Sequence, residues 1–384
     1  MDFRLTEEQE LLVKSLTELL EREVPESLTA EIDEKHEFPY KPWKALADNG
    51  ILGLGIPEAY GGTPADIQTL TLVCDVLGKY AFPLGVAYSL GVITIRDIVQ
   101  FGSEEIKAKV LGGFVKGELP IALGISEPQA GSDAASLAST ATRDGDNVIL
   151  NGQKIYCTLS GIAKYIMFMT RDPKGESPYK SMSMWLLPTD TPGLRFNNLP
   201  KAGWYSIPTY EVFIDNAVIP YKNLIGKENE GWAQLMANFE TERLALTAAC
   251  VGGAEAAFED AAKYVNQRVQ FGGPVGNNQA IQHKLVDMAI TIENMRNYCN
   301  KVAWMMDNNI PVRYEHAMCK LYGVQGSFQV VDDAMQLLGG LGYMKAHRVE
   351  RIWRDVRLMR IGGGTDEIMY NIAGPQLLKK YRGK

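Results

Sequence analysis

The chain has few of the residues that build metal or disulfide sites. Its five cysteines stand apart, with no C-x-x-C pair among them, and its four histidines are equally dispersed. Because metal ligands come in closely spaced groups, we predict no metal site. We expect the cysteines to pack as small apolar residues with free thiols, in a reducing cytoplasm.

Several signatures of other protein classes are also missing. No G-x-G-x-x-G follows a predicted strand, which argues against a Rossmann dinucleotide site, and neither a P-loop nor a G-x-S-x-G motif occurs. No apolar run reaches the roughly 18 residues needed to span a bilayer. The opening residues, MDFRLTEEQE, are acidic and amphipathic, unlike a signal or transit peptide. We therefore expect a cytoplasmic protein with no membrane partner.

Positive charge is in short supply as well. The net charge of −7 argues against nucleic acid as the main partner, since phosphate binding needs a clustered positive surface. With 46% hydrophobic and 22% charged residues, the composition is that of an ordinary globular protein. A length of 384 residues allows roughly two or three domains.

The dominant feature that is present is a helical stretch at residues 231–268. Good helix formers prevail there, and apolar positions recur every three or four residues. Residues 244–254 carry no charge, so we expect them to be buried on most sides. Glu242 stands at the edge of this span, where an unpaired carboxylate costs several kcal/mol unless its pKa shifts. Two interpretations follow: Glu242 forms a structural ion pair with Arg243 or a distant base, or it transfers protons.

The order of local patterns divides the chain into three parts. Residues 1–118 are mostly helical in period, and they open with Thr6 and Gln9 at the spacing of a capping box. Short β-type runs separated by turn residues follow Pro120, and helical periodicity returns at Glu230. We therefore predict an α+β protein with a helical domain at 1–118, an antiparallel β domain (a barrel or sandwich) at 119–228, and a helical domain at 229–384. The predicted helices of the first part include 43–48, 70–80, 86–101 and 104–114, and the predicted strands are 139–142, 148–150, 165–170, 182–187 and 210–214.

Three loops combine glycine with polar or charged residues. Residues 123–133 (LGISEPQAGSD) leave backbone N–H groups and hydroxyls free to approach a ligand. Residues 268–272 (RVQFG) place an arginine beside an aromatic ring, which suits a phosphate near a planar group. Residues 360–368 (RIGGGTDEI) place three glycines before the start of a helix, where anions bind readily. Taken singly, each loop also fits a purely structural role as a surface loop, a helix end or a helix–helix turn.

Taken together, these loops resemble the acyl-CoA dehydrogenase family, and the resemblance covers essentially the whole chain. Residues 126–133 match the family's T-E-P-x-A-G-S-D, and residues 268–272 match its R-x-x-F-G. Residues 336–343 match Q-x-x-G-G-x-G followed by an aromatic residue, and Arg354 with Asp355 matches a further R-D pair. Residues 261–271 and 336–368 look closest to the bacterial branch that contains crotonobetainyl-CoA reductase and related anaerobic acyl-CoA dehydrogenases.

The resemblance implies a C-terminal four-helix bundle, FAD between that bundle and the β domain, and a homodimer or homotetramer. It implies that seven residues contact the FAD of their own subunit: Leu123, Ile125, Ser126, Tyr156, Thr158, Thr365 and Glu367. It implies that five more contact the FAD of a neighbouring subunit: Arg268, Phe271, Gln279, Gln336 and Gly340. It implies that four residues contact the acyl-CoA: Ser132, Phe239, Arg243 and Gly362. Electron-transferring flavoprotein is the implied redox partner.

The chain departs from the family where the chemistry is done. Many members carry Y-E-G-T in the last loop, and its glutamate is the catalytic base; residues 362–365 here read G-G-G-T, so Gly363 stands at that position. Isovaleryl-CoA and long-chain members instead carry the base on the long helix, directly before an arginine. Glu242 and Arg243 resemble that arrangement. The resemblance thus implies Glu242 as the base, with the Gly363 N–H as an oxyanion donor.

The implied function is FAD-dependent α,β-dehydrogenation of an acyl-CoA, or reduction of the matching enoyl-CoA, in fatty acid or carnitine metabolism. Two alternatives stay open: a base-free acyl-CoA lyase of the desulfinase type, and a non-catalytic flavoprotein that binds acyl-CoA. Many members also carry G-x-R where this chain has Gly203, Trp204 and Tyr205. The role of Tyr205 at the arginine position is open from the sequence.

Overall fold

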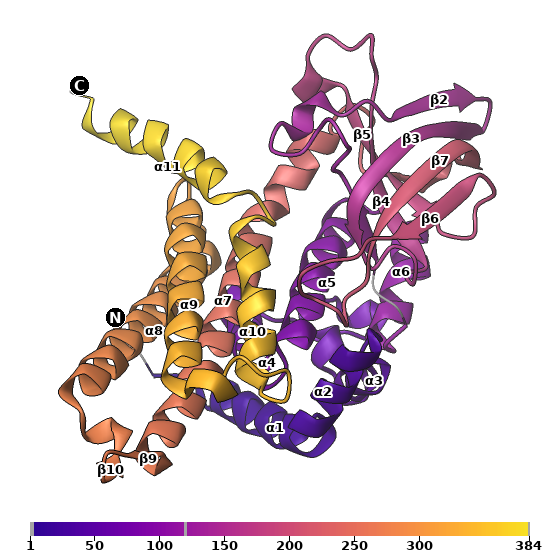
Figure 1. Ribbon diagram of the computed structural model, residues 1–384. Coiled ribbons are helices and arrows are strands. Elements are labelled where there is room, and N and C mark those ends of the chain that lie inside the picture. The colour runs from indigo at the N-terminus through magenta and orange to yellow at the C-terminus, as the bar shows by residue number, and fades with distance from the viewer. Residues whose placement is uncertain (1–3, 119–120, 383–384) are drawn as a thin grey trace.

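The computed structural model describes residues 4–118 and 121–382, and its helices, strands and helices follow one another as predicted (Figure 1). Residue 119, where the second domain is predicted to begin, lies outside the described residues, as does Pro120. Six helices make up the first part: α1 (Glu7–Glu23), α2 (Glu26–Lys35), α3 (Tyr40–Asp48), α4 (Ile67–Tyr80), α5 (Phe82–Phe101) and α6 (Glu104–Val115).

The local signals of the first part are confirmed in detail. The Thr6 hydroxyl accepts from the Gln9 N–H at 3.2 Å, and the Gln9 side chain accepts from the Thr6 N–H, which completes the capping box. Helix α5 begins earlier than the predicted 86–101 because Pro83, in its first turn, needs no N–H partner. In the described part of the chain only α5 has the length and apolar composition of a membrane span, but 76% of that segment is buried inside the protein. Packing against α4 and α7 accounts for its apolar residues.

The β domain is built from two four-stranded sheets with the orders β1-β4-β5-β8 and β2-β3-β7-β6. Side chains from both sheets meet in one core that includes Phe168, Trp185 and Val212. The strand pairs are antiparallel except β1–β4, which is parallel. The strands are β1 (Ala122–Gly124), β2 (Thr140–Asp144), β3 (Asn147–Thr158), β4 (Tyr165–Arg171), β5 (Met182–Pro188), β6 (Leu194–Asn198), β7 (Thr209–Pro220) and β8 (Leu224–Ile225).

Three of these strands are absent from the sequence prediction. Strands β1 and β8 have three and two residues, which is too short for an alternating pattern to register. Strand β6 lies at a sheet edge and carries polar residues. Strand β3 extends far beyond the predicted 148–150, and its register shifts twice against β7. The second shift brackets Tyr156, whose φ of +59° turns its side chain out into an exposed position.

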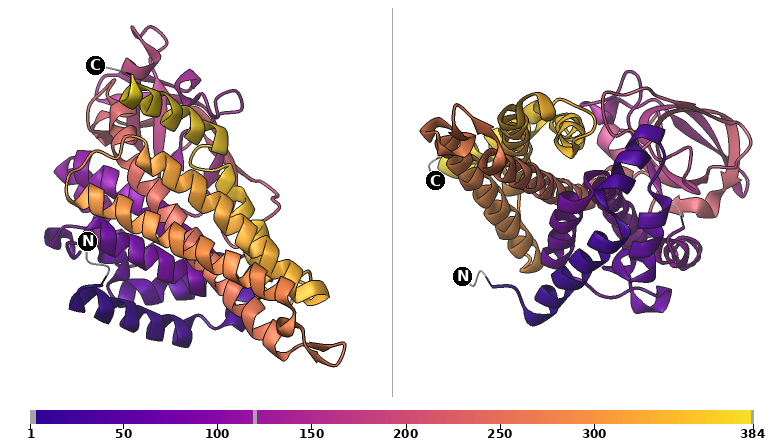
Figure 2. Two further views of the ribbon diagram at one scale, coloured as in Figure 1. Left: turned by 90° about the vertical axis from the view of Figure 1, so that its left-hand side faces the viewer. Right: turned by 60° about the horizontal axis from the view of Figure 1, so that its bottom comes forward.

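The C-terminal helices pack around α7, which confirms the long helix predicted at 231–268. Helices α7, α8 and α9 run side by side (Figure 2), and α7 also contacts α4, α5 and α10. The helices are α7 (Gly231–Gln267), α8 (Gln279–Asp307), α9 (Glu315–Leu338), α10 (Arg348–Arg357) and α11 (Asp366–Tyr381), and a small hairpin of β9 (Val269–Gln270) and β10 (Gly273–Pro274) joins α7 to α8.

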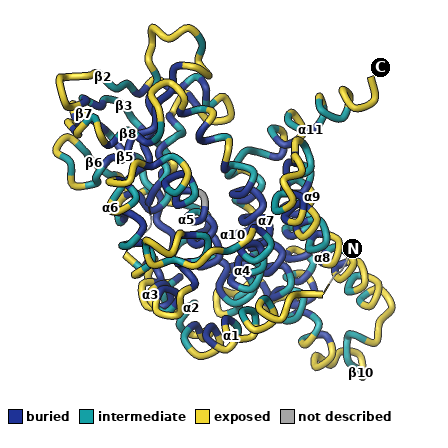
Figure 3. The backbone as a smooth tube through the Cα atoms, turned by 180° about the vertical axis from the view of Figure 1, so that it is seen from behind, coloured by how far each residue is buried: buried dark blue, intermediate teal, exposed yellow. Residues whose placement is uncertain are grey.

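Burial is continuous along the middle of α7. Every residue of the uncharged span 244–254 is buried, as predicted (Figure 3). Two glycines let α4 and α7 cross closely: a Cβ on Gly252 would lie 1.9 Å from the Asp75 carbonyl oxygen, and one on Gly78 would lie 2.1 Å from that of Ala249. Glu242 therefore stands on the part of α7 that enters the shared core.

Candidate functional site

Glu242 is buried on α7, with only 4% of its surface exposed. Its Oε2 atom has no hydrogen-bond partner among the described residues. Burial raises the pKa of Glu242 to about 7, although the charges of Arg243 and Lys320 oppose this rise. A buried carboxylate with a free oxygen and a pKa near neutrality can both take up and release a proton.

Arg243 is buried beside Glu242 but directs its guanidinium elsewhere. Its Nε donates to the Gly363 carbonyl oxygen at 3.1 Å, and its Nη1 lies 3.1 Å from His316 Nε2. His316 Nδ1 lies 2.7 Å from the Val312 carbonyl oxygen, which can only accept, so Nδ1 carries the proton and Nε2 accepts from Arg243. Burial lowers the pKa of His316 to about 4 and keeps the ring neutral. The structure thus does not support the interpretation of Glu242 as an ion-pair partner of Arg243.

Lys320 on α9 is the third charged residue of this cluster, and the sequence analysis missed it. It is completely buried, and its Nζ donates to the Gly364 carbonyl oxygen. Burial and, to a smaller extent, the positive charge of Arg243 lower the pKa of Lys320 to about 8. Lys320 lies at helical spacing from the buried Ala317 and Val324 of α9. A lysine at a position where the pattern predicts an apolar residue is the sequence feature by which it could have been identified.

The glycine loop, residues 362–364, lies over these two cations. Gly363 and Gly364 have φ values of +64° and +97°, in the region that favours glycine. Neither of their N–H groups donates a hydrogen bond to another described residue. The loop leads into α11, which Thr365 caps as predicted, since its hydroxyl accepts from the Ile368 N–H at 3.3 Å. Two free N–H groups beside a helix N-terminus form a site for negative charge.

A second carboxylate, Asp97 on α5, lies near Glu242. Asn238 stands one turn before Glu242 on α7, and its Nδ2 donates to Asp97 Oδ1 at 2.6 Å. Asp97 is completely buried, and its Oδ2 has no partner among the described residues. Burial raises the pKa of Asp97 to about 7, and the negative charge of Glu242 raises it as well. No local pattern could have singled out Asp97, because only the crossing of α5 and α7 brings it to Glu242.

The structure brings together the residues expected to line the flavin. Leu123 lies in β1, and the loop after it is tied to β3, where the Ile155 N–H donates to the Ser126 carbonyl oxygen at 2.9 Å. Thr158 follows on the same strand as Tyr156, which is 69% exposed. Together with Ile125, these residues form one partly exposed surface of the β domain, which we call the β-domain face (Leu123, Ile125, Ser126, Tyr156 and Thr158).

A buried ion pair that the sequence analysis missed holds the β-domain face in place. Lys154 Nζ donates to Glu127 Oε1 at 2.7 Å and to the Ile125 carbonyl oxygen at 3.1 Å. Burial acts to raise the pKa of Glu127, but the Lys154 charge and the hydrogen bonds from Ser139 and Ala138 lower it to about 2. Glu127 therefore stays ionised and fixes the loop that carries Ile125.

A second set of expected cofactor residues lies at the other end of the bundle. Arg268 follows the last residue of α7, about 38 Å from Glu242 along the helix axis at about 1.5 Å per residue. The hairpin of β9 and β10 carries the fully exposed Phe271 and lies at the end of the bundle opposite α11 (Figure 1). This distal set, all of it exposed, is Arg268, Phe271, Gln279, Gln336 and Gly340.

Helix α9 carries the last two members of the distal set to the same end. His316 contacts Arg243, and a Cβ on Gly323 would meet the Thr247 side chain, so α9 runs alongside α7 in the same direction. Gln336 in the last turn of α9 therefore lies far from Glu242 in its own chain. A ligand that touched both Glu242 and the distal set would have to meet them from different subunits.

The expected substrate residues are only partly assembled. Phe239 is half-buried, and the Arg243 guanidinium carbon lies 5.3 Å from its ring centroid. Gly362 lies in the glycine loop, where its N–H donates to the Leu358 carbonyl oxygen at 2.9 Å. Ser132 is exposed in the loop at 126–133. Glu367, which is expected to contact the FAD and not the substrate, is exposed in the first turn of α11.

Tyr205 and Trp204 lie at a domain junction. The Tyr205 ring stacks on His36 with ring centroids 4.4 Å apart. The guanidinium carbon of Arg354, a residue of α10, lies 4.3 Å from the Tyr205 ring centroid. Trp204 Nε1 donates to the Asp355 carbonyl oxygen at 3.0 Å. Both aromatic residues therefore join the β domain to α2 and α10, which answers the question that the sequence left open.

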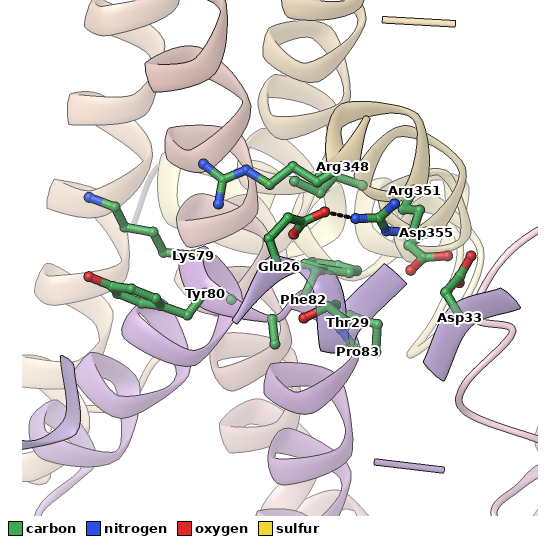
Figure 4. Close-up of a pocket in the computed structure, with 13 residues that line it drawn as sticks. Glu26, Thr29, Asp33, Lys79, Tyr80, Phe82, Pro83, Arg348, Arg351 and Asp355 are labelled. Carbon is green, nitrogen blue, oxygen red and sulfur yellow. Dashed lines mark hydrogen bonds and ion pairs between the residues drawn. The ribbon is translucent and has the colours of Figure 1, made fainter. Parts of the chain in front are cut away.

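A small pocket elsewhere is lined by charges that already have partners. It lies among α2, α5 and α10, where Arg351 pairs with Glu26 (Figure 4). Arg348 on its rim binds Asp260 at 2.6 Å, and Lys79 binds Glu259 at 2.7 Å. The pocket is a seam between helices, and none of its residues belongs to the cluster around Glu242.

Comparison with known proteins supplies three matching family models. They are the N-terminal, middle and C-terminal domains of acyl-CoA dehydrogenase, at residues 6–118, 122–217 and 229–378. The chain is 44% identical over 385 residues to the probable acyl-CoA dehydrogenase YdiO of Escherichia coli K12, with 100% of both chains covered.

Solved structures agree over nearly the whole length. Butyryl-CoA dehydrogenase from Megasphaera elsdenii is 31% identical with a TM-score of 0.92, covering 98% of this chain and 100% of that one. PigA, solved with FAD and proline, is 26% identical with a TM-score of 0.94, covering 99% of this chain and 100% of that one.

Proposed function

Because the chain belongs to the acyl-CoA dehydrogenase family, we propose that Glu242 is the acid–base group of its reaction. The protein is an oxidoreductase that acts on a CH–CH bond of an acyl-CoA, and homologues in this family bind FAD. The observation that carries the proposal is the buried Glu242, with its unpartnered Oε2, beside a loop that has no side chain at the family's usual base position.

In the oxidative direction, ionised Glu242 takes the proton from the α-carbon of the thioester. The negative charge that develops on the thioester oxygen is received by the free N–H of Gly363 in the glycine loop. A pKa of about 7 lets Glu242 exchange protons efficiently near neutral pH. In the reductive direction, protonated Glu242 returns the proton to the α-carbon. When bound, FAD would exchange a hydride with the β-carbon, which completes the two-electron balance.

The residues present fit FAD in two places. The β-domain face offers an exposed, partly apolar surface fixed by the Lys154–Glu127 pair. The distal set offers an exposed ring in Phe271 and an open backbone at Gly340, where an added Cβ would meet nothing within 4 Å. We propose that the β-domain face holds the flavin and that a neighbouring subunit's distal set holds its pyrophosphate and adenosine, with Thr365 and Glu367 near the last loop. The enzyme would then be a homodimer or homotetramer.

We further propose that enoyl-CoA reduction is the favoured direction, as the likeness to the crotonobetainyl-CoA reductase branch suggests. Asp97 supports this proposal, because two buried carboxylates that repel each other keep a proton between them near neutral pH. Electron-transferring flavoprotein would exchange electrons with the enzyme, since the sequence carries no nicotinamide-binding motif. The cytoplasm is the proposed location.

The base assignment is tested by anaerobic mixing of FAD-replete protein with a panel of acyl-CoAs that differ in length, branching and charge. Glu242→Gln should reduce the rate of flavin bleaching by about 10²–10⁴-fold while FAD is retained. Glu240→Gln is the matched control, because Glu240 lies on the same helix and is also partly buried, yet it should bleach at close to the wild-type rate.

Bleaching of Glu242→Gln at the wild-type rate would overturn the assignment. If wild-type flavin is neither reduced by any acyl-CoA nor reoxidised by any enoyl-CoA after chemical reduction, redox turnover is wrong for this chain. A base-free lyase or a non-catalytic acyl-CoA-binding flavoprotein would then be the better description.

A further inference from the structure

Two buried cations from different helices bind consecutive carbonyl groups of the glycine loop. Arg243 of α7 donates to the Gly363 oxygen, and Lys320 of α9 donates to the Gly364 oxygen. Arg243 is 8% exposed and Lys320 is completely buried. Lys320 forms no ion pair with a described residue, so its ammonium group bears the cost of burial without a carboxylate bonded to it. The burial of Lys320 is therefore not explained by the stability of an ion pair.

Peptide geometry connects these contacts to the free N–H groups. A trans peptide is planar, and its C=O points opposite to the next N–H. With the Gly363 oxygen held by Arg243, the Gly364 N–H is turned away from that guanidinium. The Gly364 oxygen, held by Lys320, fixes the following peptide in the same way. The two anchored peptides carry the N–H groups of Gly364 and Thr365, which have no partner in the described part of the chain. The Gly363 N–H belongs to the preceding peptide, so the anchors orient it indirectly, by holding Gly363 and Gly364 at their carbonyl groups.

Three consecutive glycines cannot hold this orientation by themselves. Glycine loses more conformational freedom on ordering than any other residue, and the loop has no side chain to pack. The stem of Lys320 lies directly beneath it, since a Cβ on Gly363 would be 3.7 Å from both Lys320 Cε and Leu246 Cδ1. The order of the loop must come from neighbours: the Leu358 carbonyl oxygen accepts from the Gly362 N–H, and Arg243 and Lys320 bind the carbonyl groups of Gly363 and Gly364.

We propose that Lys320 is a positioning residue for the reaction. With Arg243, it fixes the glycine loop so that the free N–H groups meet the thioester oxygen as negative charge develops there. Positive charge at the carbonyl end of a peptide also strengthens its N–H as a donor. This inference rests on the proposed function, in which the Gly363 N–H serves as an oxyanion donor.

The charges around Lys320 give the inference a pH signature. Glu242, Arg243 and Cys250 face it from α7, and Asp366 faces it from α11. The Lys320 charge lowers the pKa of Glu242, so a neutral residue at position 320 should move the onset of oxidative activity to higher pH. Deprotonation of Lys320 above about pH 8 should loosen the loop, which adds a descending alkaline limb to the wild-type profile.

The experiment compares wild type, Lys320→Met and Lys320→Arg as FAD-loaded enzymes. Three readouts are used: hydrogen exchange of residues 359–368, the Kd of a β-ketoacyl-CoA that binds as its enolate, and the pH profile of flavin reduction. Lys320→Met should exchange faster, bind the enolate roughly 10-fold more weakly, and reduce flavin roughly 10–100-fold more slowly with little change in KM. Lys320→Arg should keep the order of the loop and lose the alkaline limb, because a guanidinium stays charged.

Arg296→Met is the matched structural control. Arg296 binds Asp75 at 2.7 Å in the bundle, away from the glycine loop, so its loss should lower stability without altering the three readouts. A folded Lys320→Met protein with wild-type exchange and wild-type enolate affinity would overturn the proposal. If Lys320→Met fails to fold, an alkaline limb that persists unchanged in Lys320→Arg would overturn it. Hydrogen exchange of the loop involves no proton transfer by Glu242, so failure of the base assignment is recognised separately by Glu242→Gln.

Discussion

At the scale of single residues, the two buried carboxyl groups of the site, Glu242 and Asp97, are not paired with a cation among the described residues. Glu242 and Asp97 each have a buried oxygen without a partner among the described residues, and burial raises both pKa values to about 7. Because both are raised above their unfolded values, they stabilise the fold below about pH 4 and lose that contribution as pH rises toward 7. The two buried carboxylates thus hold a proton near neutral pH at a cost in stability.

Removal of one carboxylate should make the other easier to ionise. In Asp97→Asn the repulsion on Glu242 disappears, so the onset of acyl-CoA oxidation should move to lower pH by roughly half a unit or more. The measurement is the rate of anaerobic flavin reduction between pH 5 and pH 9. Asp260→Asn, a change in a paired carboxylate far along α7, is the control and should leave the onset unchanged. An onset that stays at the wild-type pH in Asp97→Asn would show that the two carboxylates do not interact.

At the scale of elements, α7 places one end of the site and depends on close packing to do so. Its crossing with α4 has no room for a methyl group, because a Cβ on Gly252 would lie 1.9 Å from the Asp75 carbonyl oxygen. Backbone atoms are the obstacle there, so the helices must move apart. Such a shift would also displace the cluster that α7 shares with α9.

Gly252→Ala should therefore destabilise the protein by several kcal/mol, despite the better helix propensity of alanine. Gly112→Ala on α6 is the matched control, because its Cβ would meet nothing within 4 Å and the change should stabilise the fold by about 0.5–1 kcal/mol. Thermal and urea unfolding of the two variants give the comparison. Equal midpoints for the two variants would contradict the close crossing.

At the scale of the whole molecule, Glu242 and the distal set cannot serve one cofactor within a single chain. The length of α7 separates them by about 38 Å, at about 1.5 Å per residue. In the proposed arrangement, a complete site takes Glu242 from one subunit and Arg268 from another. Subunit composition should therefore control activity.

Co-expression of two inactive variants tests this arrangement. Mixed oligomers of Glu242→Gln and Arg268→Ala should regain activity, because one site in a mixed pair receives both native residues. Separately purified variants mixed without exchange of subunits serve as the control and should stay inactive. Absence of activity in confirmed mixed oligomers would place Arg268 and Glu242 in the same functional unit and contradict the shared site.

How much could be predicted from the sequence depends on how far apart the interacting residues lie. The capping box at Thr6 and the start of α11 at Thr365 follow from neighbours within three positions, and both are confirmed. Strands β1 and β8 were missed because two or three residues carry no period, and their pairing is decided by other strands. The parallel pairing of β1 with β4 also joins residues more than forty positions apart.

By itself, the sequence determined the long helix, its uncharged middle and the absence of a carboxylate at Gly363, since periodicity and residue type are local properties. It also placed Glu242 at the edge of the core. Only the tertiary structure decided that Arg243 turns to the glycine loop and that Lys320 and Asp97 stand beside Glu242. Those contacts join three helices across spans of 44 to 120 and more residues, and their energy exists only once the helices have packed.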